Sequence, residues 1–178
     1  MARALFAAGC FWCIEAVFSQ LKGVESAISG YSDGDTIDPS YEAVCAGETN
    51  HAEVVQVTFD PEVIQYQDLL NILFALHDPT AVDQRHYSDT PSKQYSSAVY
   101  YTDADQKAQA LATIEELAPH YERPIVTAVK PAATFYPAEE YHQGYFMKNP
   151  EAGGYCQAVV APKFVKAKAK FAEFWRDA

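Results

Sequence analysis

The sequence lacks the features of a membrane, secreted or nucleic-acid-binding protein. No apolar run approaches the roughly 18 residues of a membrane-spanning helix, and the N-terminus has no charged and apolar signal pattern. Basic residues are scarce, because 13 Lys and Arg stand against 24 Asp and Glu, which gives a formal net charge of -11. Nucleic acids and anionic membranes need a positive surface, so we expect neither as a partner. We expect a cytoplasmic protein.

Cysteine is also sparse, at 4 of 178 residues. Without a secretory signal, this number argues against a disulfide framework and favours redox or catalytic use of some thiols. Cys10 and Cys13 form one C-x-x-C pair, whereas Cys45 and Cys156 lie far from any other cysteine. A structural zinc site needs four ligands, so we expect no metal and no other cofactor.

The length and the 49% hydrophobic content fit one domain, residues 1–178. Hydrophobic periodicity predicts alternating elements in the first half of the chain. Their order, β-α-β-β-α-β, predicts an α+β fold, a ferredoxin-like two-layer α/β sandwich with a split βαβ core and C-terminal additions. The predicted elements are strand Arg3–Ala8, helix Trp12–Leu21, strand Val24–Ser29, strand Glu53–Phe59, helix Tyr66–Leu76 and strand Tyr95–Tyr101.

The second half of the chain predicts additions to this core. They are helix Ala104–Leu117 with an Asp103/Gln106 capping box, strand Ile125–Val129, a short helix Ala138–Phe146 and a terminal helix opened by Pro162. In the terminal helix we expect a buried stripe of Phe164, Phe171, Phe174 and Trp175. Two stretches, Gly30–Asn50 and Asp78–Gln94, are longer than a compact domain needs, and long loops of that kind are commonly functional.

Cys10 lies between a predicted strand and a predicted helix. Gly9 lets the backbone turn, so we expect Cys10 at a helix N-terminus with its side chain exposed. Unpaired N–H groups and the helix dipole stabilise a thiolate there by about 1 kcal/mol, which needs further help to ionise most of the thiol at neutral pH. An inert buried cysteine is the alternative. Phe11 and Trp12 are either an apolar wall for a substrate or ordinary core aromatics.

Glu53 begins a strand of alternating pattern. The period of two places it on the same face as the apolar residues of that strand, so its carboxyl group is aimed at the core. Desolvation there raises the pKa of the carboxyl and can keep it protonated, as a proton donor near neutral pH. The alternative is that Glu53 reaches water from the strand end. His51, two residues away, is another candidate group.

Eight short motifs occur in order along nearly the whole chain. They are Gly9–Phe18, Gly30–Tyr31, Pro39–Cys45, His51–Val55, His77–Thr80, Gln94–Tyr95, Phe135–Gln143 and Tyr155–Cys156. With these motifs the chain resembles the A-type peptide methionine sulfoxide reductases. Several separate motifs in one order make the resemblance far more specific than a lone C-x-x-C.

The resemblance implies an oxidoreductase that reduces methionine S-sulfoxide, free or in proteins, and so repairs proteins after oxidative stress. It implies that Cys10 attacks the sulfoxide sulfur and that Glu53 donates a proton to the sulfoxide oxygen. The other implied contacts are Tyr41 and Tyr95 to that oxygen, and Phe11 and Trp12 to the methyl group of the substrate.

The resemblance also implies how the nucleophile is regenerated. Cys10 would become a sulfenic acid, which condenses with a second thiol to a disulfide that thioredoxin reduces. The Tyr-Cys motif near the C-terminus points to Cys156 as this resolving thiol. Many family members have Gly where this chain has Cys13, so Cys13 is an alternative resolving thiol.

Another part of the chain departs from the family pattern. The stretch Gln84–Ser96 replaces a usual family motif and is longer. Within it, Asp89 best matches the substrate-binding aspartate of the family, and a solvated loop aspartate is the alternative. We expect Cys45 to be structural, because it lies outside the sites that the chemistry requires.

Two other classes of function remain open from the residues. A general thiol-disulfide oxidoreductase would use the Cys10/Cys13 pair and would need neither Glu53 nor an aromatic pocket. A zinc-binding interaction module would hold one metal ion per chain.

Overall fold

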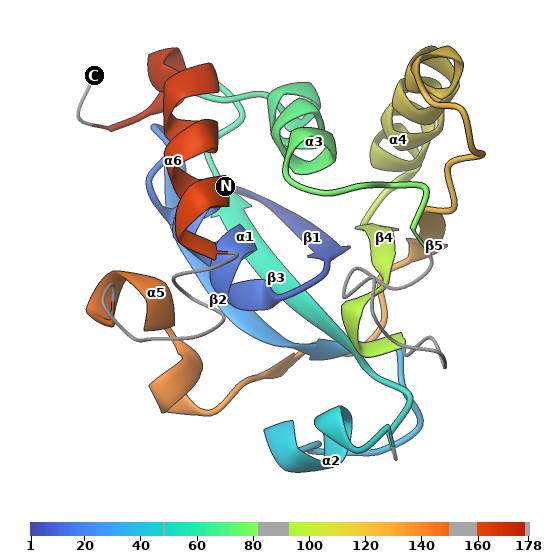
Figure 1. Ribbon diagram of the computed structural model, residues 1–178, viewed down its shortest axis with the longest axis vertical. Coiled ribbons are helices and arrows are strands. Elements are labelled where there is room, and N and C mark those ends of the chain that lie inside the picture. Colours follow the sequence, from blue (N-terminus) through green and yellow to red (C-terminus); the bar gives the residue numbers. More distant parts are fainter. Residues whose placement is uncertain (48, 82–92, 150–159, 177–178) are drawn as a thin grey trace.

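The computed structural model describes residues 1–47, 49–81, 93–149 and 160–176 (Figure 1). Its centre is one six-stranded mixed sheet with the strand order β5-β4-β1-β3-β2-β6. The four core strands are β1 (Ala2–Ala8), β2 (Val24–Ser32), β3 (Ala52–Phe59) and β4 (Ser97–Tyr101). Their pairs are all antiparallel.

The core strands have the arrangement that the β-α-β-β-α-β order predicts. β3 lies between β1 and β2, and β1 lies between β3 and β4, so each βαβ unit is split by a strand of the other. The predicted ferredoxin-like sandwich is therefore confirmed. β5 (Ala128–Pro131) extends one edge parallel to β4, and β6 (Tyr136–Pro137) extends the other edge antiparallel to β2.

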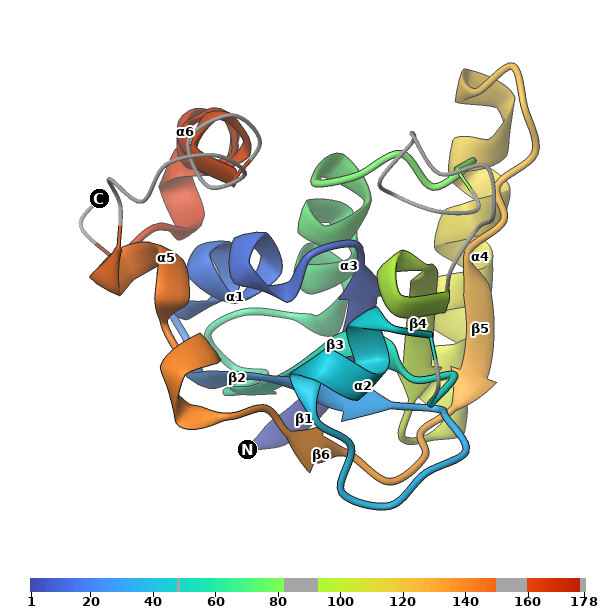
Figure 2. The ribbon, with the colours of Figure 1, turned by 60° about the horizontal axis from the view of Figure 1, so that its bottom comes forward.

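Helices cover one face of this sheet, as Figure 2 shows. α1 (Phe11–Ser19) and α3 (Tyr66–Ala75) pack on the sheet, α4 (Ala104–Leu117) lies beside α3, and α6 (Ala161–Lys170) packs against α1. Most buried apolar side chains lie between these helices and the sheet. A smaller buried cluster on the opposite face includes Tyr100 and is covered in part by Phe135.

The remaining helical elements are short. They are α2 (Tyr41–Cys45), α5 (Tyr145–Lys148) and the single turns η1 (Lys93–Tyr95), η2 (Ala118–His120), η3 (Glu140–His142) and η5 (Ala172–Phe174). Two of them, α2 and η1, lie in stretches predicted to be a loop or the start of a strand. None of the helices in the described ranges has the length and apolar character needed to cross a bilayer.

Several boundaries differ from the prediction for physical reasons. The helix expected at 138–146 is broken into η3 and α5, because Gly144 between them takes a left-handed conformation with φ 65°. The fifth strand starts at Ala128 rather than Ile125, because the N–H of Val126 bonds to the carbonyl of Pro79 instead of to β4. Elsewhere the first-half elements agree with the prediction to within three residues.

Helix ends also agree in part. Asp103 caps α4 by accepting from the N–H of Gln106 at 2.8 Å, but the Gln106 side chain accepts from Thr102 rather than from Asp103. Pro162 lies in the first turn of α6, as predicted. The expected apolar stripe of this terminal segment is only partly buried: Trp175 is fully buried, whereas Phe164, Phe171 and Phe174 are half-buried and pack against the core.

Candidate active site

Cys10 is the N-cap residue of α1 and follows β1 directly. Gly9 makes the turn with φ 87°, a left-handed conformation that favours glycine. The backbone N–H groups of Trp12 and Cys13, in the first turn of α1, lower the pKa of the Cys10 thiol. The predicted helix N-terminus is thus confirmed.

The predicted exposure of Cys10 is wrong. The residue is 9% exposed, and burial together with the negative charge of Glu53 raises the pKa of its thiol well above the ordinary value. These effects outweigh the two N–H groups of the helix start. At neutral pH Cys10 is therefore a thiol, and the expectation that its thiolate is stabilised relative to that of an ordinary cysteine is wrong.

Glu53 is buried beside this thiol, at 1% exposure. Its Oε1 accepts from the N–H of Phe11 at 3.1 Å, and its Oε2 accepts from Nε2 of Gln94 at 2.7 Å. Burial raises the pKa of Glu53 to about 8, and the two hydrogen bonds oppose this shift. The alternation of β3 thus predicted the direction of the side chain, and the carboxyl is mostly protonated at pH 7.

Gln94 is a site residue to which the sequence assigned no role. It lies in η1 and is 2% exposed. Its Nε2 donates both to Oε2 of Glu53 and to Sγ of Cys45, the latter at 3.2 Å. These two residues belong to β3 and α2, far from position 94 in the chain. The only sequence signal was its place in a motif beside Tyr95.

Tyr41 and Tyr95 belong to the same cluster. Burial raises the pKa of each phenol above its ordinary value, and the charges of Glu53 and Cys10 act on both phenols in the same direction. The two hydroxyl groups therefore stay protonated and can donate hydrogen bonds over the working range of pH. The structure brings both predicted tyrosines to the thiol and the acid.

An aromatic group lies next to the thiol. The ring of Phe11 is fully buried, with its centroid 6.4 Å from that of Tyr41, and the indole of Trp12 stacks on Tyr145 with centroids 4.2 Å apart. Nε1 of Trp12 donates to Nδ1 of His142 at 3.0 Å. His142 also packs on Tyr41 at 4.3 Å, and the sequence assigned it no role.

Two buried or half-buried carboxylates hold the segment that carries His142. Glu15 of α1 accepts from the N–H of Gly144 at 2.8 Å. Glu139 accepts from the hydroxyl of Tyr31 and from the backbone N–H of Tyr41, both at 3.0 Å. These bonds fix the aromatic group against α1 and α2.

The candidate site thus places a thiol, a mostly protonated carboxyl, two phenol hydroxyls and several aromatic rings together. The sequence matches the family described as "Peptide methionine sulfoxide reductase" over residues 2–175. The chain belongs to the peptide methionine sulfoxide reductase family.

Relatives within this family match the chain along nearly its full length. It is 52% identical over 174 residues to the peptide methionine sulfoxide reductase MsrA of Pasteurella multocida, with 98% of each chain covered. It is 49% identical over 173 residues to an MsrA of Thermus thermophilus, with 97% of each covered.

Solved structures of the family have the same fold. The reduced form of Mxr1 from Saccharomyces cerevisiae superposes with a TM-score of 0.76 at 31% identity, covering 86% of this chain and 88% of that one. Methionine sulfoxide reductase A of Corynebacterium diphtheriae gives 0.77 at 31% identity, covering 85% and 76%. Mxr1 in complex with Trx2 gives 0.56 at 25% identity, covering 81% and 84%.

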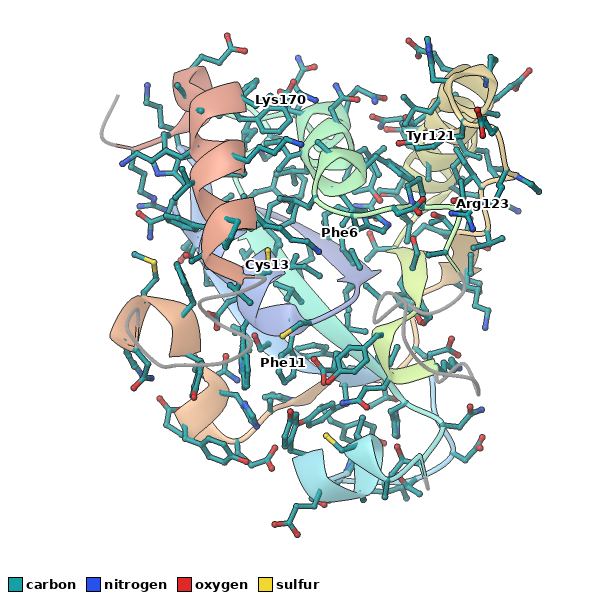
Figure 3. The ribbon with its side chains drawn as sticks, in the orientation of Figure 1. Phe6, Phe11, Cys13, Tyr121, Arg123 and Lys170 are labelled. Atoms are coloured by element: carbon teal, nitrogen blue, oxygen red, sulfur yellow. The ribbon has the colours of Figure 1, made fainter. Side chains whose placement is uncertain are left out.

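The other thiols of this family member lie in different surroundings. Cys13 is 5% exposed on the α6 side of α1; burial raises its pKa to about 11, and the charge of Lys163 opposes this shift. Figure 3 shows Cys13 near the start of α6, whereas Phe11 lies on the side toward α2. Cys156 and Asp89 lie outside the described residues.

Cys45 corrects an expectation. It was expected to be structural and outside the site, but its sulfur contacts Gln94, the partner of Glu53. His51, the other candidate group, is buried, and its Nε2 bonds to the carbonyl of Thr36 at 2.8 Å. Among the described residues, no group of three or more His, Cys, Asp and Glu side chains could hold a metal ion.

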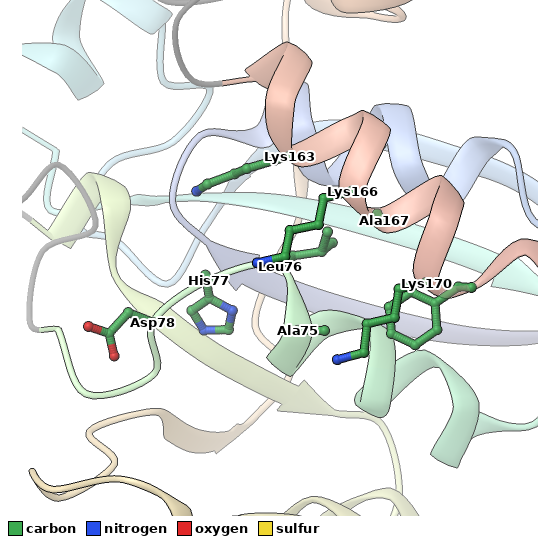
Figure 4. Close-up of a pocket in the computed structure, with 9 residues that line it drawn as sticks. Ala75, Leu76, His77, Asp78, Lys163, Lys166, Ala167 and Lys170 are labelled. Carbon is green, nitrogen blue, oxygen red and sulfur yellow. The ribbon is translucent and has the colours of Figure 1, made fainter.

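Away from the cluster around Cys10, a hollow lies between the end of α3 and α6 (Figure 4). It has a volume of about 350 Å³, and its charged lining residues include Lys163, Lys166 and Lys170. His77 also lines it; both of its ring nitrogens have hydrogen-bond partners, and burial lowers its pKa to about 4, so the ring is neutral. This hollow is lined by residues other than those of the cluster around Cys10.

Proposed function

We propose that this chain reduces the S epimer of methionine sulfoxide to methionine, free or in proteins, and so repairs proteins after oxidative damage. The observation that carries the proposal is the buried, mostly neutral carboxyl of Glu53 beside the N-cap thiol Cys10. A sulfoxide has a basic oxygen and a sulfur that becomes electrophilic once this oxygen is protonated. A proton donor next to a sulfur nucleophile fits both needs.

In the proposed reaction, Glu53 gives its proton to the sulfoxide oxygen while the sulfur of Cys10 attacks the sulfoxide sulfur. The proton that the thiol loses returns to the Glu53 carboxylate. The attack forms a bond between the two sulfurs, and this bond breaks as the hydroxyl group moves from the substrate sulfur to the sulfur of Cys10. Cys10 becomes a sulfenic acid, and methionine leaves. Two hydrogen bonds to Glu53, from Phe11 and Gln94, stabilise its carboxylate at the moment when it has lost its proton.

Other residues bind the substrate in this proposal. Tyr41 and Tyr95 donate hydrogen bonds to the sulfoxide oxygen, and their raised pKa values keep the donors in place. Phe11 and Trp12 hold the methyl group. Asp89, outside the described residues, is proposed as a further substrate contact on the resemblance alone.

Regeneration of Cys10 needs a second thiol and a reductant. The sulfenic acid condenses with the thiol of Cys156, or alternatively of Cys13, which forms a disulfide and releases water. Thioredoxin then reduces this disulfide, and the structure of Mxr1 in complex with Trx2 supports this assignment. We propose that the whole chain acts as one catalytic domain and works in the cytoplasm, where such reductants keep thiols reduced.

The alternative function, general disulfide exchange by Cys10 and Cys13, is less well supported. Burial raises the pKa of both thiols, which disfavours the thiolate that attacks a disulfide. General disulfide exchange would also leave the buried carboxyl of Glu53 and the aromatic residues beside Cys10 without a role.

A single-turnover assay tests the proposed function. The reduced enzyme is mixed with methionine S-sulfoxide or R-sulfoxide without a reductant, and the methionine formed is measured. We expect about one methionine per enzyme from the S epimer. Cys10→Ser should form none, with Cys156→Ser as the control that keeps this turnover. Methionine formation by Cys10→Ser, or reduction of the R epimer alone, contradicts the proposal.

A further inference from the structure

Cys45 is a thiol that the proposed reaction does not use, yet its sulfur contacts a residue of the site. Nε2 of Gln94 donates to its Sγ at 3.2 Å. Tyr41 and Cys45 are the first and last residues of α2, so they lie one turn apart on one side of that helix.

The position of α2 is itself fixed. The Ser40 hydroxyl caps the helix by accepting from the N–H of Ala43, and the N–H of Tyr41 donates to Glu139. Cys45 is an exposed residue, so its sulfur lies at the rim of the site, between solvent and the buried amide of Gln94. The helix that carries this sulfur is therefore held in place, with the sulfur within hydrogen-bond distance of Gln94.

The Gln94 amide has one donor end and one acceptor end, and only the donor end can stabilise a carboxylate. With Nε2 toward Oε2 of Glu53, the amide supports the charged form of the acid. With the amide reversed, its carbonyl oxygen would face the Glu53 carboxylate and repel it. A second acceptor for the same NH2 group, the sulfur of Cys45, favours the first orientation.

We propose that Cys45 is a positioning residue of the reductase site, whose sulfur orients the Gln94 amide toward Glu53. The proposal rests on the proposed function and adds a residue to it. Cys45 acts through Gln94 and does not touch the reacting atoms.

The consequence for the acid can be measured as a pH dependence. If the amide loses its orientation, Glu53 loses a hydrogen bond to its charged form, and its pKa rises further. Four ionisable groups feel the charge of Glu53, and burial raises the pKa of each: Cys10, Tyr31, Tyr41 and Tyr95. Glu53 is therefore the group expected to lose its proton first as the pH rises through 8.

The experiment compares single-turnover rates between pH 6 and pH 10 for the wild type, Cys45→Ala, Cys45→Ser, Gln94→Ala and the double variant. We expect Cys45→Ala to slow the reaction about 3- to 10-fold, as for one lost hydrogen bond, and to move the fall in rate to higher pH. Gln94→Ala should move this fall in rate at least as far toward higher pH. The double variant should move it no further than Gln94→Ala alone does. Cys45→Ser keeps an acceptor and should restore part of the effect.

A second readout does not depend on activity. NMR of the Glu53 carboxyl carbon in the wild type and in Cys45→Ala gives the two pKa values directly, and we expect the value in the variant to be higher. An unmoved pKa with an unmoved pH profile overturns the role of Cys45, even if the rate falls. A wild type that forms no methionine overturns the proposed function instead, while the NMR comparison still decides the positioning role.

Discussion

The backbone N–H of Phe11 donates to Oε1 of Glu53 across 3.1 Å, and Phe11 is the residue that follows Cys10 in the chain. The Glu53 carboxyl on β3 is thus hydrogen-bonded to the helix turn that follows the Cys10 thiol. This bond limits how far the thiol and the carboxyl can move apart. It also makes the ionisation of each group depend on the other, because the Glu53 charge raises the pKa of Cys10.

Substitution of the acid tests its role in proton transfer. Glu53→Gln can donate a hydrogen bond but cannot give a proton, so we expect the single-turnover rate to fall about 10²- to 10⁴-fold. In the wild type the rate should fall as the pH rises above about 8, because the carboxyl then loses the proton that it donates. Quenched-flow measurement of methionine checks both. An unchanged rate in the variant removes Glu53 from the mechanism.

The same substitution should stabilise the fold. Glu53 has a pKa of about 8 in the folded protein against about 4.5 as an ordinary glutamate, so the folded state binds more protons between these values. Stability from this group is complete below pH 4.5 and is lost as the pH rises toward 8. At pH 7, Glu53→Gln should raise the free energy of unfolding by about 1 to 3 kcal/mol. Urea unfolding of the wild type and the variant at pH 7 and at pH 4.5 measures this difference in the free energy of unfolding. An equal difference at both pH values would contradict the role of the Glu53 pKa.

The thiol of Cys10 should alkylate slowly. Its pKa is raised by burial and by the Glu53 charge, so iodoacetamide should react with it more slowly than with an ordinary cysteine. Glu53→Gln removes the charge, and we expect faster alkylation above pH 8, where the wild-type carboxyl is ionised. Mass spectrometry of the Cys10 peptide gives the rate, with exposed Cys45 as the internal reference. Equal alkylation rates in the wild type and the variant would show that the Glu53 charge does not affect the ionisation of the Cys10 thiol.

The resolving thiol can be identified by mapping the disulfide. After one equivalent of methionine S-sulfoxide, we expect Cys10 bonded to Cys156, and Cys156→Ser should still complete one turnover. Cys13 is buried under the start of α6 with a raised pKa, which makes it the slower partner. A Cys10–Cys13 disulfide in the wild type would assign the resolving role to Cys13.

The hydrogen bond from Trp12 to His142 should affect substrate binding. Trp12→Phe keeps an aromatic ring but removes the donor to Nδ1 of His142, so we expect KM to rise about 3- to 10-fold with a small change in kcat. Trp175→Phe is the matched control, because Trp175 is buried against Phe164, outside the cluster around Cys10. A similar rise of KM in both variants would indicate a general loss of packing.

Local patterns predicted much of this molecule because they depend on neighbours in the chain. The alternation of β3 placed Glu53 toward the core, and Gly9 marked the turn into α1. Both inferences need only a period and a backbone preference. The burial of Cys10 could not be obtained in this way, because the groups that desolvate it come from distant parts of the chain.

The missed site residues have the same cause. Gln94 meets Glu53 and Cys45, and His142 meets Trp12, across separations of 41 to 130 positions in the chain. An amide, an imidazole or a lone thiol has no spacing that reveals such contacts. The prediction that Cys45 is structural has the same cause, since only its contact with Gln94 of η1 places its sulfur at the site.

The central place of β1 in the sheet affects how the protein acquires its reactivity during synthesis. β1 is bordered by β3 and β4, and Cys10 leaves the ribosome well before Glu53, Gln94 and His142. Until those segments emerge, its thiol has no acid beside it and no cover, so it ionises like any free cysteine, with a pKa of about 8.5. The nascent chain therefore carries an ordinary thiol, and the reductase nucleophile exists only after the later strands have closed around it.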